Sequence, residues 1–179
     1  VLDAEALEEL QDAYVIIPNE YPALTGHVQP GGEAWISGDV GGLVVAAAIP
    51  GAAVTTPVTV IIHGLDDTAQ PNGYALVGTI FDIKVFDAAG RYLQHFAQPV
   101  TLTIQYGSAP SQVELSVPPT LWQWNGATGV WEALPATVDS ASQVITLHLN
   151  QPATLGAFQS EQSIAPQPQS IYLPLIESE

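Results

Sequence analysis

The chain has 179 residues, no Cys and no Met, and its 18 acidic residues face only two basic ones, Lys84 and Arg91, for a formal net charge of −16 at pH 7. This charge argues against nucleic acids and anionic membranes as partners, because both are bound through cationic contacts to phosphate. The lack of Cys excludes a disulfide framework and a thiolate zinc site. The hydrophobic fraction of 47% is enough for a buried core, and the length fits one large or two small domains.

The first part of the chain, residues 1–32, is predicted to lie ahead of the main domain. Residues 3–13 predict a short helix, since apolar residues recur on one face and acids occupy the first turn, where the helix dipole favours them. Residues 14–17 (YVII) predict a short strand. Residues 21–32 are predicted to be a loop.

The middle of the chain, residues 33–158, is predicted to be the main domain, because short β-branched runs alternate there with Gly, Pro and Asn turns. In the clearest run, residues 99–106, Val, Leu and Ile alternate with Thr and Gln, which predicts a strand with one buried face. Strands are predicted at residues 33–37, 43–49, 56–63, 74–86, 99–106, 120–124, 130–134, 143–149 and 154–158. Their regular spacing without helical crossovers predicts an all-β, mainly antiparallel sandwich or barrel.

The last part of the chain, residues 159–179, is predicted to be an extended C-terminal arm. It begins with a polar, Pro-rich linker, a composition that favours extended conformations. Residues 171–176 (IYLPLI) follow and have about the length of a normal strand. Pro174 restricts this segment to the edge of a sheet, since proline cannot donate to a ladder.

Three stretches of the main domain carry a family resemblance: residues 43–65 (LVVAAAIPGAAVTTPVTVIIHGL), 81–106 (FDIKVFDAAGRYLQHFAQPVTLTIQY) and 121–149 (LWQWNGATGVWEALPATVDSASQVITLHL). Residues 42–158 thereby resemble the ZU5 family, in particular the bacterial ZU5-like modules of exported and surface proteins. The resemblance implies an antiparallel β-sandwich used for structure or interaction. Some ZU5-containing proteins cut themselves at a His-Phe-Ser motif. The equivalent residues here, 151–153 (QPA), lack the His and the Ser, so we expect no autoproteolysis.

The expected location is extracellular or at the cell surface, after removal of a signal peptide. The composition, rich in Thr, Gln, Ser, Pro, Gly and Val and poor in Lys and Arg, is that of many bacterial exported proteins. The longest apolar runs, such as residues 41–50, are too short to cross a bilayer, so no membrane span is expected.

No catalytic residue is predicted, and the protein is not expected to be an enzyme. The four His residues stand in no recognisable nucleophile motif, which favours hydrogen-bonded structural roles for His27, His63, His95 and His148. Lys84 is the single lysine. Because Lys84 lies inside a predicted strand, its side chain could form an isopeptide bond. An ordinary ion pair with Asp82 or Asp87 is the favoured interpretation.

Two small-ligand sites are candidates by residue type. Asp66, Asp67 and Asn72 crowd one polar loop and offer the oxygen ligands that calcium takes, which makes calcium the one cofactor considered. Trp122 and Trp124 share one face of a strand and could stack on a sugar, although cross-strand packing is the more common role of such residues.

The terminal apolar segments carry the leading functional prediction. A sandwich leaves edge strands with unpaired backbone groups, and an extended segment can complete such an edge as a donor strand. The side chains expected to dock are Ile171, Tyr172, Leu173, Leu175 and Ile176, with Tyr14, Val15 and Ile16 as a second set. The sequence thus predicts a non-catalytic extracellular structural protein that forms homo-oligomers or a filament. Docking within one chain stays open, as does a carbohydrate- or calcium-binding accessory module.

Overall fold

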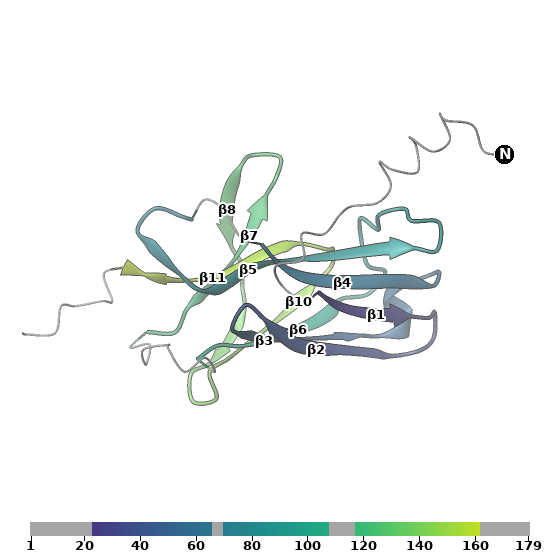
Figure 1. Ribbon diagram of the computed structural model, residues 1–179, viewed down its shortest axis with the longest axis horizontal. Coiled ribbons are helices and arrows are strands. Elements are labelled where there is room, and N and C mark those ends of the chain that lie inside the picture. The colour runs from purple at the N-terminus through teal and green to yellow at the C-terminus, as the bar shows by residue number, and fades with distance from the viewer. Residues whose placement is uncertain (1–22, 66–69, 108–116, 162–179) are drawn as a thin grey trace, which may run out of the picture.

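The computed structural model describes residues 23–65, 70–107 and 117–161, and this part of the chain forms two antiparallel β-sheets (Figure 1). One sheet has six strands, in the spatial order β1 (Leu24–Val28), β4 (Val58–Leu65), β5 (Tyr74–Asp87), β11 (Thr154–Ser160), β7 (Thr120–Asn125) and β8 (Val130–Ala133). The other has five, in the order β2 (Ala34–Val40), β3 (Leu43–Ile49), β6 (Val100–Gln105), β10 (Val144–Leu149) and β9 (Thr137–Asp139). The single helical element in these residues is the three-residue 3-10 turn η1 (Gly51–Ala53).

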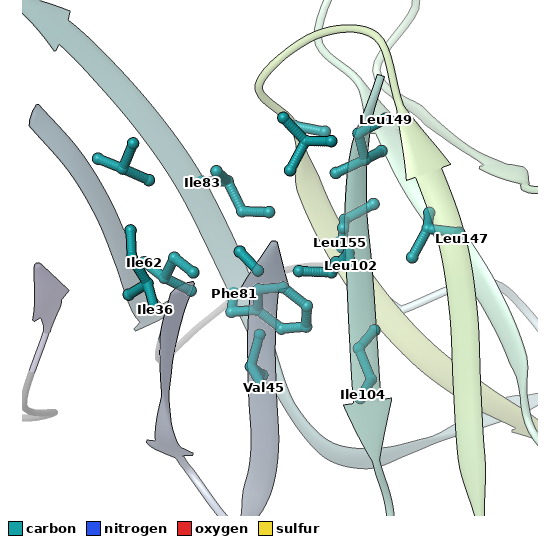
Figure 2. Close-up of a cluster of buried hydrophobic side chains, with 14 of the residues drawn as sticks. Ile36, Val45, Ile62, Phe81, Ile83, Leu102, Ile104, Leu147, Leu149 and Leu155 are labelled. Atoms are coloured by element: carbon teal, nitrogen blue, oxygen red, sulfur yellow. The ribbon is translucent and has the colours of Figure 1, made fainter. Parts of the chain in front are cut away.

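The core lies between the two sheets and consists of the side chains on the inward-facing side of each strand. Figure 2 shows Ile36, Val45, Ile62, Phe81, Ile83, Leu102, Ile104, Leu147, Leu149 and Leu155, which come from both sheets and are all buried. Each large side chain buried this way contributes about 1.5–3 kcal/mol of transfer free energy. The architecture is therefore that of a β-sandwich, in which the two sheets share one core.

The predicted strands of the middle region are present. β3 has the bounds expected from the sequence, and β5 is one continuous strand of 14 residues. In β6 the alternation is confirmed, since Val100, Leu102 and Ile104 are buried while the Thr residues between them are half-buried. These strands were predicted correctly from apolar residues at every second position, because one face of each strand is covered by the opposite sheet.

Two strands differ from the sequence expectation. The prediction of a loop over residues 21–32 is wrong in part, because residues 24–28 form β1. This strand pairs along all five of its residues with β4. β9 was not predicted either, and its three residues pair with one end of β10. The sandwich thus includes a strand N-terminal to residue 33, and β11 continues two residues past 158.

The terminal predictions fall outside the described residues. These are the helix at residues 3–13, the strand at residues 14–17, and the C-terminal arm with its apolar segment at residues 171–176.

Candidate functional site

A second apolar cluster lies on the outer face of the six-stranded sheet, away from the core. Its members, here called the aromatic cluster, are Leu65, Tyr74, Leu76, Ile80, Trp122, Trp124, Trp131 and Phe158. Strand alternation puts them there. Leu121 pairs with Ala157 and both lie in the core, whereas the next residue, Trp122, pairs with Gly156 and faces outward.

Five rings of the aromatic cluster form a continuous string of edge-to-face contacts. The ring centroids are 5.0 Å apart for Tyr74 and Trp122, 6.4 Å for Trp122 and Phe158, 5.1 Å for Phe158 and Trp131, and 5.6 Å for Trp131 and Trp124. Phe158 is 0% and Trp131 is 9% exposed, so the middle of the string is fixed in the protein. Each such pair stabilises by about 0.5–1.5 kcal/mol beyond area burial. The last ring, Trp124, is therefore held firmly while remaining half-exposed.

A hollow of about 310 Å³ opens beside Trp124. We call it the Trp124 hollow. Its lining residues are Gln70, Pro71 and Asn72 from the loop before β5, and Trp124, Gly129, Val130 and Trp131 from the β7–β8 hairpin. None of these seven residues carries a charge.

Hydrogen bonds within the hairpin shape one wall of this hollow. The side-chain oxygen of Asn125 accepts from the backbone N–H groups of Ala127 and Thr128, at 3.0 and 3.3 Å. The N–H of Gly129 donates to the carbonyl of Asn125 at 2.8 Å, and Gly129 has a φ of 67°, a conformation that glycine adopts without strain. These hydrogen bonds close a tight turn that joins β7 to β8.

The structure brings two separate sequence candidates together at this hollow. Trp122 and Trp124 share a face as predicted, but they differ in surroundings, since Trp122 packs against Tyr74 and Phe158 while Trp124 lines the hollow. Asn72, considered as a calcium ligand, lines the same hollow. Its proposed companions Asp66 and Asp67 lie outside the described residues. No local sequence pattern shows that Asn72 and Trp124 line one hollow, because only the order of the strands brings them together.

A small polar network occupies another part of the same outer face. The Nζ of Lys84 lies 3.4 Å from Asp82 Oδ2, which is the ion pair favoured from the sequence, and the hydroxyl of Thr154 donates to Asp82 Oδ1 at 3.2 Å. His63 stands opposite Asp82 on β4 and is only 7% exposed. Burial, and next the charge of Lys84, lower the pKa of His63, while Asp82 opposes them.

The His residues otherwise fit structural roles. His27 and His148 each have Nδ1 3.1 Å from a Thr hydroxyl on the neighbouring strand, as expected for hydrogen-bonded side chains. His63 departs from this expectation, because its buried Nδ1 has no hydrogen-bond partner within the described segments. Such an atom costs free energy rather than supplying a reagent.

A groove of about 380 Å³ lies on the outer face of the other sheet. Its lining includes Ala34, Trp35, Ala48, Pro99 and Thr101, and we call it the Trp35 groove. Trp35 is 66% exposed and points away from the core, as the sequence predicted.

Metal and membrane sites find no support in the parts of the chain that can be described. Across residues 23–65, 70–107 and 117–161, no three His, Asp or Glu side chains come close enough together to hold a metal ion. In the same ranges no helix has the length and apolar character needed to cross a membrane.

No family model and no curated protein matches the chain. The resemblance to ZU5-like modules therefore stays a prediction, which rests on the sequence motifs alone.

Proposed function

We propose that this protein is a non-catalytic, extracellular structural module of the ZU5-like type, which assembles with copies of itself through its C-terminal arm. The observation that carries the proposal is the edge strand β2. Among the residues that the structure describes, the sheets end in four edge strands, β1, β8, β2 and β9, and β2 is the longest, with seven residues. Its outer backbone groups can accept a further strand. The Trp35 groove lies on the outer face of the same sheet, over one end of β2, β3 and β6.

The proposed occupant of this edge is the segment 171–176 of a second copy. The linker that follows Glu161 has about ten residues and can reach on the order of 30 Å, enough to leave one small domain and meet the next. The segment carries no charge, so it avoids the repulsion that a net charge of −16 otherwise imposes on self-association. In the proposed contact, its Leu and Ile side chains pack on the exposed ring of Trp35, and aromatic residues of this kind often dominate interface energy.

The expected assembly is a filament. Docking of the arm of one copy on β2 of the next is head-to-tail, and a head-to-tail contact that does not close into a ring continues indefinitely. Because the repulsion between acidic copies is screened by salt, assembly should increase with ionic strength.

The test is deletion of residues 170–179. The full chain should form oligomers or filaments by multi-angle light scattering and electron microscopy, and the truncated chain should be monomeric with an unchanged circular dichroism spectrum. Trp35→Ala should weaken assembly, whereas Val130→Ala, a change at the exposed edge strand β8, should not. A full chain that stays monomeric at high salt, or a truncated chain that assembles normally, would overturn the proposal.

A further inference from the structure

We propose that the Trp124 hollow is a binding site for a neutral sugar, in which Trp124 stacks on the C–H face of a pyranose ring and the amides of Gln70 and Asn72 bind its hydroxyl groups. The site lies on the outer face of the six-stranded sheet, whereas the assembly proposed above uses an edge of the other sheet. The two functions are therefore independent.

The size and lining of the hollow suit a small ligand. Its volume of about 310 Å³ is at the lower end of the range of roughly 300–1,000 Å³ that small-molecule sites occupy. Its lining combines the apolar indole rings of Trp124 and Trp131 with the amide side chains of Gln70 and Asn72. An apolar wall with a few polar groups opposite is the usual arrangement of such sites.

The charges around the hollow select a neutral ligand. The lining residues that the structure describes are uncharged in a chain of net charge −16, so an anion would be repelled there. The acid in β8, Glu132, stands opposite Gln123 rather than Trp124, and so lies on the other face of the sheet. There its Oε1 accepts a hydrogen bond from Asn125 Nδ2 at 2.7 Å.

The amide side chains then distinguish a sugar from a purely apolar ligand. An amide offers both donors and an acceptor, which match hydroxyl groups that also donate and accept. Both Gln70 and Asn72 are exposed, so their amides are accessible to a ligand. A purely apolar ligand would leave these amides hydrated by water and gain no hydrogen bonds from them.

The stacking ring is already in place before any ligand arrives. Trp124 is fixed by its contact with the buried Trp131, and the loop opposite is tied by a hydrogen bond from the N–H of Tyr74 to the carbonyl of Pro71 at 3.2 Å. A site that needs little ordering on binding keeps more of its contact energy as affinity.

The experiment is calorimetric titration of the full chain with cellohexaose, xylohexaose, mannohexaose, maltohexaose and chitohexaose, with oligogalacturonate as a charged comparison. At least one neutral hexasaccharide should bind with a Kd below about 1 mM. Trp124→Ala and the double variant Gln70→Ala/Asn72→Ala should each weaken that binding about tenfold or more. Trp35→Ala, which removes an exposed Trp on the other sheet, should leave binding unchanged.

The double variant keeps the test decisive if Trp124→Ala unfolds, because Gln70 and Asn72 are exposed loop residues. The inference is overturned if none of the neutral probes binds, if oligogalacturonate binds more tightly than all of them, or if the double variant binds as well as the natural chain. An equal loss in Trp35→Ala would place the site elsewhere and overturn it as well. Deleting residues 170–179 abolishes the proposed assembly but should leave sugar binding intact, so the two proposals fail separately.

Discussion

Ile36 of β2 packs directly on Gly26 of β1, so that a methyl group at position 26 would overlap Cγ1 and Cδ1 of the Ile36 side chain. In a second contact nearby the two strands exchange roles, since Leu24 of β1 lies over Gly38 of β2. Both strands are sheet edges, one from each sheet. Two glycines therefore let the edges of the sandwich approach closely at this end, and each receives an aliphatic side chain from the opposite sheet.

The first prediction concerns this contact. Gly26→Ala should lower the free energy of unfolding by about 1–3 kcal/mol, because the added methyl overfills a closed space. The measurement is urea denaturation followed by circular dichroism. Gly32→Ala is the control, since its methyl would meet nothing closer than 3.6 Å and should change stability by less than about 0.5 kcal/mol. In an Ile36→Ala background the cost of Gly26→Ala should shrink. An equal cost in both backgrounds would show that overlap with Ile36 is not the cause.

The same contact explains why the sequence analysis missed β1. Glycine is depleted in strands, so the segment Leu-Thr-Gly-His-Val reads as a loop. Position 26 needs a glycine because the Ile36 side chain packs against it. Ile36 lies on the opposite sheet, so no local sequence pattern reveals this contact. β9 was missed for another reason, since three residues are too few to show an alternation. Strands such as β3, β6 and β10 were predicted because three or more apolar residues alternate along their buried faces.

The candidate site was predictable only in part, for a topological reason. That Trp122 and Trp124 share a face follows from the period of a strand. That Asn72 comes near Trp124 depends on β11, which is late in the chain yet lies between β5 and β7. Which strand enters between two others is set by the packing of the whole domain. The sequence therefore indicates residues on both sides of the Trp124 hollow but not that they lie close together.

The second prediction compares two neighbouring residues of β8. Trp131→Ala should destabilise the protein by about 3–5 kcal/mol, since it removes a buried ring that contacts both Phe158 and Trp124. Val130→Ala should cost less than about 0.5 kcal/mol, because Val130 is 50% exposed. Chemical denaturation of both variants is the measurement. Similar losses for the two would contradict a rigid aromatic cluster on the outer face.

The third prediction is a dependence of stability on pH that comes from His63. Its pKa is lowered in the folded protein, so below the ordinary pKa of about 6.5 the unfolded chain takes up a proton that the folded chain resists. Stability contributed by the neutral His63 is thus complete above about pH 6.5 and falls as the pH drops toward the folded pKa. His63→Gln should flatten the profile of Tm against pH between 7 and 5. A variant with an unchanged slope in this window would contradict the assignment.

The fourth prediction concerns Asp87, whose carboxylate organises the turn after β5. It accepts backbone N–H groups from Ala89 and Arg91, both at 2.9 Å, and the Nε of Arg91 at 2.8 Å. The backbone N–H of Arg91 is the main cause of the lowered pKa of Asp87, followed by the Arg91 side chain. Because the folded pKa is depressed, the stabilisation is present above the ordinary pKa of about 3.9 and is lost as the pH falls through the folded value.

Asp87→Asn should therefore lower the Tm at pH 7, and the difference from the natural chain should close as the pH is taken below about 4. Asp139→Asn is the matched comparison, since Asp139 accepts from the hydroxyl of Ser142 at 2.6 Å and from the N–H of Ala141 at 3.0 Å. Salt at about 1 M should reduce the effect of Asp87→Asn more than that of Asp139→Asn, because the Nη2 of Arg91 also pairs with Asp87 at 2.7 Å. Equal salt responses would show that the ion pair adds nothing to the turn beyond its backbone hydrogen bonds.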